Sequence, residues 1–336
     1  MRLVQIATLT QRRVALVREP DLVLLREADS VFALAGKALS ESRRLSEIVA
    51  QLLSDHILSY DAIFDGQSEW KLLAPIDYPS QPQRVHVSGT GLTHLGSARD
   101  RQAMHAAQTT GEAAQMTDSM RMFEWGRQQG RPAEGAIGIA PEWFYKGDGS
   151  IVQPPFGPLV IPGFAEDGGE EAEVAAIYLI ARDGTPWRIG MTTGNEFSDH
   201  VFERRNYLNL ASSKLRTCSL GPELVIDPEF DDVSGQVRIL RNDQVIWEKQ
   251  IRTGELNMCH SLANMEHHHF KFPAHRQPGM VHVHFLGADS LSFGEGIQLQ
   301  AGDITEVRFQ DFGRPLRNTI VKEEPVTNPL RVRVME

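Results

Sequence analysis

The spacing of apolar residues predicts that most of this chain forms short strands. Runs rich in apolar residues recur between turns that carry glycine or proline, a pattern typical of a mainly β domain. The runs between Val85 and Gly313 read VHVSGTG, EVAAIYLI, PELVI, QVRIL, VIWEKQI, MVHVHFLG and ITEVRFQDFG. Helical spacing recurs only in patches there, around residues 100–128 and 257–267. Many short strands with few helices favour a mainly β domain over a doubly wound α/β domain.

The first part of the chain predicts a smaller unit that contains both helix and strand. Short β-like runs occur at Leu3–Ile6, Val14–Val17 and Leu22–Leu25. From Ser30 to Leu58 the apolar residues fall at helical spacing. The segment Ala74–Arg84 then carries three prolines, which mark a boundary between domains. We expect a small N-terminal α+β domain over residues 1–80 and a larger domain over residues 81–336.

One predicted strand begins with carboxylates that its own pattern would bury. In GGEEAEVAAIYLI, residues 168–180, alternation places Glu171 and Glu173 on the face of Ala175 and Ile177. The opposite face is also apolar, so both sides of the strand should be covered. Two buried carboxylates on one face are costly unless a cation receives them.

A third acid, Glu196, follows a glycine turn in GMTTGNEFSDH. Carboxylates from neighbouring strand ends would provide the all-oxygen, anionic ligand set that Mg²⁺ or Mn²⁺ prefers. The alternative without a metal is that these glutamates are exposed to solvent at the end of a strand.

Composition limits the classes of partner. The chain has 336 residues, 41% of them hydrophobic, and a formal net charge of −10, which opposes binding to nucleic acid or to an anionic membrane. The N-terminus has no apolar signal core, only two cysteines occur, and no apolar run is long enough to span a membrane. We expect a cytoplasmic protein with a small-molecule ligand.

Two further clusters could carry chemistry. In VHVHFLGAD, His282 and His284 share a strand face and Asp289 follows, which resembles the metal site of cupin-type barrels; half-buried packing is the alternative. In EHHHF, residues 266–270, consecutive histidines diverge and cannot all bind one ion, so we interpret this segment as a helix end.

The other cluster is SGTGLTHLGSARDR, residues 88–101, which reads as a turn from strand to helix. It combines the imidazole of His94, the hydroxyl of Ser97, the guanidinium of Arg99 and the carboxylate of Asp100. A general base and a group that holds an anion could both come from this turn. Equally, it could be an ordinary helix start with Ser97 as cap and Asp100 at the capping-box position.

Taken in order, these segments resemble the fumarylacetoacetate hydrolase family, in particular its sugar-acid branch. The resemblance covers residues 1 to about 325. The matching segments are the E-x-E of Glu171 and Glu173, TTGNEFS with Glu196, SKLRTCSLGPELV with Lys214, FYKGDGSIVQPP with Lys146, LQAGDITEVRFQDFGRPLRN, and WKLLAPID at the end of the small domain.

The resemblance implies an α+β, mainly β fold: a mixed β-roll core with a small N-terminal domain, assembled as a homodimer or higher homo-oligomer. It also implies that Glu171, Glu173 and Glu196 hold Mg²⁺ or Mn²⁺. Lys214 would take part in catalysis, while Arg99, Lys146 and Thr253 would bind a 2-keto sugar acid.

Two departures from the family pattern affect the expected chemistry. The family has an aspartate where this chain has Glu196. The C–C hydrolases read N-Y-x-x-H-A-x-E where this chain reads LTHLGSARD, so Ser97 stands at the position of the water-activating histidine, Asp100 at that of its glutamate and His94 at that of the tyrosine. A serine cannot activate water unassisted near neutral pH.

We therefore predict a metal-dependent dehydratase that converts a 2-keto-3-deoxypentonate into 2-ketoglutarate semialdehyde. The base is left open among His94, Lys214 and a metal-bound water. One alternative is a hydrolase that cleaves a 2,4-diketo-3-deoxy sugar acid to pyruvate and a hydroxy acid, with His94 as the base. A sugar-acid-binding protein without turnover and a cupin-type oxygenase are the remaining alternatives.

Overall fold

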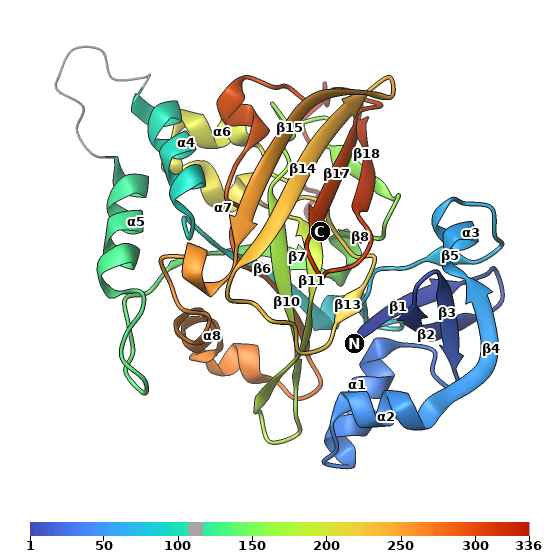
Figure 1. Cartoon of the computed structure of the whole chain (residues 1–336). Helices are drawn as coiled ribbons and strands as arrows, with labels where there is room; N and C mark the ends of the chain where they lie inside the picture. The colour runs from blue at the N-terminus through green and yellow to red at the C-terminus, as the bar shows by residue number, and fades with distance from the viewer. Residues whose placement is uncertain (107–116, 336) are drawn as a thin grey trace.

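The structure is a computed structural model that describes residues 1–106 and 117–335, without the side chains of Asp100 and residues 103–106. Its strands form two sheets (Figure 1). The larger has thirteen strands, ten of them in the order β4-β3-β2-β1-β13-β11-β10-β16-β6-β7, and the smaller has five in the order β15-β14-β17-β18-β9. The mainly β architecture predicted from the sequence is confirmed.

The strands of the larger sheet are β1 Arg2–Ala7, β2 Arg12–Arg18, β3 Asp21–Leu25, β4 Leu53–Ser59, β5 Lys71–Leu72, β6 Val85–Gly91, β7 Glu142–Asp148, β8 Val152–Gln153, β10 Ala172–Ile180, β11 Pro186–Asn195, β12 Cys218–Leu220, β13 Leu224–Val225 and β16 Val281–Phe285. Those of the smaller sheet are β9 Pro158–Ile161, β14 Val233–Arg241, β15 Gln244–Thr253, β17 Ile304–Phe309 and β18 Leu316–Lys322.

The helices are α1 Val31–Ser40, α2 Leu45–Leu52, α3 Tyr60–Phe64, α4 Leu95–Ala106, α5 Asp118–Gln129, α6 His200–Arg205, α7 Leu210–Ser213 and α8 Leu262–Phe270. Short 3₁₀ turns lie at η1 Pro82–Arg84, η2 Gly149–Ile151, η3 Tyr207–Asn209, η4 Glu255–Asn257, η5 Pro273–Arg276 and η6 Ser292–Glu295. No helix in the described part of the chain has both the length and the hydropathy of a membrane span.

Strand β10 is covered on both faces, as its apolar pattern predicts. All nine of its residues are buried. Val174, Ala176 and Tyr178 belong to the hydrophobic core shared with the smaller sheet and α8. Ala175 and Ile177 belong to a second core, which includes residues of α1 and α2. Glu171 and Glu173 therefore enter the molecule on the face of the second core.

The N-terminal elements differ from the prediction at one point. Helical spacing was expected from Ser30 to Leu58, but helix ends at Leu52 and β4 follows at once. Leu58 and Ile57 pair with Leu22 and Val23 of β3, so strand pairing overrides the local helical pattern. Strand β1 also pairs with β13, so the N-terminal strands and β11, β10 and β16 belong to one continuous sheet. The domain boundary near residue 80 stays a prediction.

Three contacts, centred on the buried side chains of Tyr60 and Glu223, link the N-terminal elements to the rest of the chain. The Tyr60 hydroxyl donates to Glu223 Oε1 at 3.0 Å, and Arg2 lies 3.0 Å from Glu223 Oε2. Arg314 stacks over the Tyr60 ring at 3.8 Å from the centroid. Charge-assisted contacts of this kind hold the N-terminal elements in a fixed orientation on the rest of the chain.

Candidate active site

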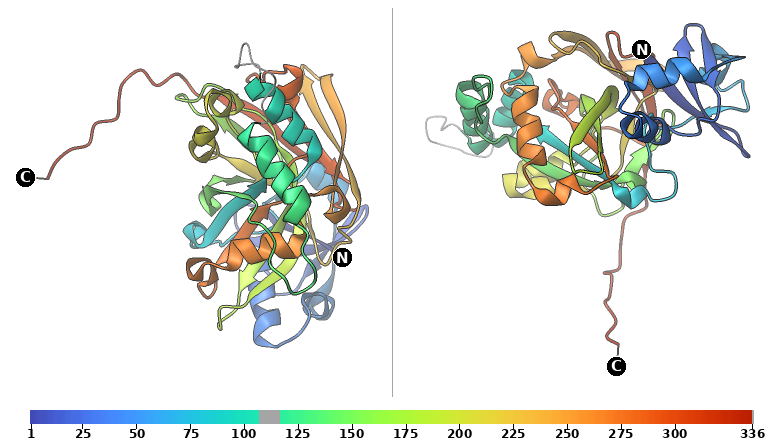
Figure 2. Two further views of the ribbon diagram at one scale, coloured as in Figure 1. Left: turned by 90° about the vertical axis from the view of Figure 1, so that its left-hand side faces the viewer. Right: turned by 90° about the horizontal axis from the view of Figure 1, so that it is seen from below.

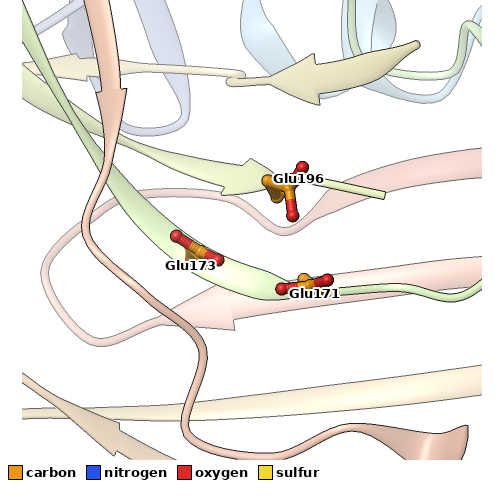
Figure 3. Close-up of side chains that lie close together, drawn as sticks. All are labelled: Glu171, Glu173 and Glu196. Atoms are coloured by element: carbon orange, nitrogen blue, oxygen red, sulfur yellow. The ribbon is translucent and has the colours of Figure 1, made fainter. Parts of the chain in front are cut away.

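The three acids singled out in the sequence meet at one point (Figure 3). Glu171 directly precedes β10 and Glu196 directly follows β11, and the Glu196 N–H donates to the Glu171 carbonyl at 2.9 Å. Glu173 is the second residue of β10. One oxygen from each side chain lies within 4.8 Å of the others, and all three residues are buried. We call Glu171, Glu173 and Glu196 the acidic trio.

The donor set of the trio suits a hard divalent cation. Each member offers carboxylate oxygen, the ligand that Mg²⁺ and Mn²⁺ prefer. Burial, and then the charges of Glu171 and Glu196, raise the pKa of Glu173 well above its ordinary value. Such mutual repulsion is relieved when a cation is shared. Among the described residues the trio is also the one group of acid, histidine or cysteine side chains that could hold a metal.

A backbone donor fixes the orientation of Glu173. The Gly287 N–H donates to Glu173 Oε2 at 2.6 Å. Gly287 has φ +98°, and a Cβ at this position would lie 1.9 Å from Thr93 Oγ1. Glycine is therefore required here by both conformation and space. The loop that carries Gly287, whose N–H binds Glu173, therefore packs directly on the turn that carries Thr93 and His94.

Two buried lysines line the trio. Lys214 Nζ lies 2.5 Å from both Glu171 Oε1 and Glu196 Oε2, and it donates to Ser198 Oγ at 2.7 Å. Lys146 Nζ lies 2.7 Å from Glu196 Oε1. Burial opposes the charge of Lys214, but Glu171 and Glu196 outweigh it and raise its pKa. Lys214 is therefore an ammonium group at neutral pH, which suits the binding of an anion but not proton abstraction.

Lys146 differs from Lys214, because burial lowers the pKa of Lys146 and the opposing charge of Glu196 does not outweigh it. Its ammonium also donates to the carbonyls of Phe197 and Lys214, at 2.7 and 2.9 Å.

Arg101 and Glu142 lie in this network, and the sequence reasoning missed both. Arg101 is buried on α4 and lies 3.7 Å from Glu171 Oε2, 3.8 Å from Glu142 Oε1 and 3.4 Å from Glu203 Oε2. By contrast, Arg99 is exposed, and its substrate-binding role stays a prediction. The sequence could have indicated that only one of these two arginines is buried, because residues 99 and 101 point to different sides of a helix.

Glu142 carries the features of a proton-transferring group. The Tyr207 hydroxyl donates to Glu142 Oε2 at 2.6 Å. The other oxygen, Glu142 Oε1, is buried without a hydrogen-bond partner. It lies 2.5 Å from the point where a Cβ would stand if Gly91 were replaced by a larger residue. Burial raises the pKa of Glu142, and Arg101 and the Tyr207 hydrogen bond act against the rise. Alternation along β7, with Glu142, Phe144 and Lys146 buried, could have suggested it.

Both ring nitrogens of His94, in the strand-to-helix turn, lie within hydrogen-bond distance of threonine hydroxyls. His94 Nδ1 lies 2.8 Å from Thr93 Oγ1, and His94 Nε2 lies 3.1 Å from Thr253 Oγ1. Burial lowers the pKa of His94 to about 4, so the ring is neutral. Thr253, predicted to bind substrate, here contacts His94.

The expectation that Ser97 could cap the helix is wrong, because α4 already begins at Leu95 and Ser97 Oγ donates to the His94 carbonyl at 3.3 Å. The side chain of Asp100 lies outside the described residues.

The His-x-His pair lies on the opposite face of the sheet from the acidic trio. His284 pairs with Ala176 in register, and its two ring nitrogens lie 2.9 Å from Ser88 Oγ and 2.7 Å from Thr90 Oγ1. His282 Nδ1 lies 2.9 Å from His269 Nε2, on α8. EHHHF is a helix end, as predicted. These contacts describe packed imidazoles and not a cupin-type metal site.

The histidines packed on this face should make stability depend on pH. Burial lowers the pKa of His86 to about 4 and that of His284 to about 3. The unfolded chain takes up these protons near pH 6.5 and the folded protein does not, so stability decreases as pH falls below 6.5. Buried acids with raised pKa, such as Glu170, act in the opposite direction.

The test compares the wild type with His86→Phe. This substitution removes one titrating ring, and it breaks no hydrogen bond at the buried Nε2 of His86, which has no partner. The difference in unfolding free energy between them should change by roughly 1.4 kcal/mol per pH unit between pH 6 and 4.5, measured by urea titration. A constant difference across this range would contradict the prediction.

Comparisons with known proteins support the fold. No protein-family model and no curated protein matches the sequence. The solved structure of 2-keto-3-deoxy-D-arabinonate dehydratase complexed with magnesium and 2,5-dioxopentanoate is similar with a TM-score of 0.68 and 17% identity, covering 96% of this chain and 100% of that one.

Two isomerase structures are also similar over 96% of this chain. One is 5-carboxymethyl-2-hydroxymuconate delta-isomerase from Mycobacterium smegmatis, with a TM-score of 0.59, 16% identity and 100% of its chain covered. The other is 2-hydroxyhepta-2,4-diene-1,7-dioate isomerase from Mycobacterium marinum, with a TM-score of 0.58, 14% identity and 99% of its chain covered. The fumarylacetoacetate hydrolase-like fold expected from the sequence is confirmed, and the structures that share it include enzymes.

Proposed function

We propose that this protein is a metal-dependent hydro-lyase that removes water from a 2-keto-3-deoxypentonate to give 2-ketoglutarate semialdehyde. The observation that carries the proposal is the buried acidic trio beside two ammonium groups, on a fold shared with a dehydratase bound to magnesium and 2,5-dioxopentanoate, which is the same semialdehyde. A buried site with acidic and cationic halves suits a cation together with an anionic ligand.

The charges near the trio are consistent with a divalent ion. Five buried carboxylates, those of the trio with Glu142 and Glu203, face three side-chain cations, Lys146, Lys214 and Arg101. His200 Nε2 also lies 3.1 Å from Glu171 Oε1; burial opposes its charge, but the contact with Glu171 outweighs this and raises the His200 pKa. If all five acids are ionised, a charge of two remains to be balanced with His200 neutral, and a charge of one with His200 protonated. Glu171, Glu173 and Glu196 would hold the ion, and Mg²⁺ bound there would supply Lewis-acid stabilisation of negative charge that develops on a 2-keto acid.

The chain's own residues then divide the remaining work. Lys214 and Lys146 would bind the substrate carboxylate and the developing negative charge as fixed cations. Glu142 would take the proton from C3 as a carboxylate and return it to the departing C4 hydroxyl as an acid. The net loss is one water, and the product has a C3–C4 double bond beside the C5 alcohol. Transfer of a proton from C5 to C3 then gives the C4–C5 enol, which tautomerises to the semialdehyde without further change in composition. A raised pKa suits a group that must both accept and donate a proton near neutral pH.

The hydrolase alternative requires His94 to activate water. Both ring nitrogens of His94 lie within hydrogen-bond distance of threonine hydroxyls, so neither is directed at an open site. This observation favours dehydration.

The test is incubation of the pure protein with Mg²⁺ and each C4 epimer of 2-keto-3-deoxypentonate, followed by mass spectrometry. Loss of one water from one epimer without cleavage of a carbon bond is the expected result. Pyruvate released from a 2,4-diketo acid faster than water is lost from either epimer would establish the hydrolase instead. Binding of both epimers without any product would indicate a protein without turnover.

Variants in the turn separate the same alternatives. Ser97→Ala should reduce turnover only modestly, because Ser97 Oγ contacts a backbone carbonyl and no acid. His94→Asn should leave the identity of the product unchanged in a dehydratase. A variant His94→Asn that still binds Mg²⁺ but loses all release of pyruvate would contradict our assignment.

The lysines provide a separate prediction. Lys146→Met or Lys214→Met should lower kcat/KM at least about tenfold, because each removes a charge-assisted contact to substrate worth roughly 1.4 kcal/mol or more. Lys37→Met, at an exposed position on α1, is the control. Circular dichroism should show that each variant is folded. Wild-type kinetics in both site variants would remove the lysines from the mechanism.

A further inference from the structure

Each acid of the trio receives a hydrogen bond from a group other than the two lysines. The pairs are the Gly287 N–H with Glu173 Oε2 at 2.6 Å, the Ser198 hydroxyl with Glu196 Oε2 at 3.0 Å, and His200 Nε2 with Glu171 Oε1 at 3.1 Å. An ionised carboxylate only accepts hydrogen bonds, so His200 donates from Nε2. Hydrogen bonds of this kind orient the carboxylates that bind metal ions.

The imidazole of His200 is placed for this contact and for no other hydrogen bond among the described residues. The side chain is fully buried, and its Nδ1 has no hydrogen-bond partner. A buried polar atom without a partner costs about 1–3 kcal/mol, which an apolar side chain at this position would avoid. Stability alone therefore does not account for an imidazole next to Glu171.

Packing holds the ring of His200 in place. His200 begins α6, which lies on the side of the body away from the N-terminal strands, as Figure 2 shows. Gly169 and Ser198 exchange two backbone hydrogen bonds, at 2.8 and 3.0 Å. A Cβ at Gly169 would stand 2.2 Å from His200 Nδ1, so the ring packs directly on this backbone. The Phe293 ring lies 5.3 Å from the imidazole, centroid to centroid.

The contact gives the two oxygens of Glu171 different surroundings. Oε1 lies 2.5 Å from Lys214 Nζ and 3.1 Å from His200 Nε2. The Arg101 guanidinium lies 3.7 Å from Oε2, which is beyond hydrogen-bond distance. Lys214 ends a flexible four-carbon chain, whereas the ring of His200 is rigid and packed. His200 is therefore the group that sets the rotation of the Glu171 carboxylate.

We propose that His200 is a positioning residue, which holds the Glu171 carboxylate in the direction that a divalent ion requires. The inference rests on the metal site of the proposed function and adds a residue that orients a ligand without touching the ion. Loss of the hydrogen bond should weaken Mg²⁺ binding about 10- to 100-fold, the usual effect of removing a group that orients a metal ligand.

The test compares two variants that differ only in a donor. His200→Gln keeps an N–H donor, while His200→Met has a similar length and no donor. Both side chains are uncharged, so the comparison separates the hydrogen bond from any charge on the imidazole. Isothermal titration with Mg²⁺ should give His200→Met a dissociation constant at least about tenfold higher than that of His200→Gln. His200→Leu is a second variant without a donor, and circular dichroism should show which variants are folded.

A buried histidine on the opposite face of the sheet provides the control. His284 contacts the hydroxyls of Ser88 and Thr90 and no member of the trio. His284→Met should therefore bind Mg²⁺ as the wild type does. Equal weakening in His284→Met would overturn the proposal, because loss of any buried imidazole would then explain the result.

The outcomes separate this proposal from the proposed function. A wild type that binds Mg²⁺, with equal affinity in His200→Gln and His200→Met, would overturn the positioning role and leave the metal site intact. A wild type without affinity for Mg²⁺ would contradict the metal site itself, and the role of His200 with it.

Discussion

Replacing Glu171, Glu173 or Glu196 by glutamine is expected to abolish metal-dependent activity and to weaken Mg²⁺ binding by at least about 100-fold. The substitution nearly preserves volume but removes one of the three buried carboxylates that we propose as ligands of the ion. Isothermal titration with Mg²⁺ measures the loss without reference to any substrate. Circular dichroism at 25 °C should show a folded protein in each case.

A neighbouring acid provides the matched control for these variants. Glu170 is also buried, but its carboxylate accepts hydrogen bonds from the Ser292 N–H and hydroxyl, at 2.8 and 2.7 Å, outside the trio. Glu170→Gln should therefore retain Mg²⁺ affinity, and so should His282→Ala and His284→Ala. Metal binding that survives Glu171→Gln and Glu173→Gln but is lost in His282→Ala would transfer the metal site to the histidine face.

The position of the trio could be predicted from the sequence because strand geometry is local. Alternation places Glu171 and Glu173 on one face of β10, and a buried pair of acids already requires a cation. The register that brings Glu196 beside Glu171 follows from the β10–β11 hairpin, in which Ala172 pairs with Asn195. Two strands adjacent in sequence and paired in space leave little freedom in where their ends meet.

Arg101 and Glu142 could not be found in the same way, because their roles depend on long-range packing. The guanidinium of Arg101 joins β7, the start of β10 and α6, which are separated by many residues. Similarly, β4 was predicted as helix because its pairing partner, β3, is distant in sequence. Local pattern determines which face a residue occupies, and tertiary contacts determine which residues share that face.

Glu142→Gln is expected to lower kcat by roughly 10²- to 10⁴-fold while leaving Mg²⁺ affinity within a few fold of wild type. Glutamine keeps the volume and can still accept the 2.6 Å hydrogen bond from Tyr207, but its amide neither takes nor returns a proton. The affinity for Mg²⁺ should persist because Glu142 is not a member of the trio.

The split between lost turnover and retained metal binding is what distinguishes proton transfer from a structural role. A structural defect would weaken the metal site together with the activity, since Arg101 contacts both Glu142 and Glu171. Glu47→Gln, at an exposed position, controls for the loss of a surface charge. In the wild type the raised pKa of Glu142 should appear as a titration in the pH dependence of kcat, and Glu142→Gln should remove it. If kcat stays within about tenfold of wild type, the proton must be carried by another group, and Glu142 would then only balance the charge of Arg101.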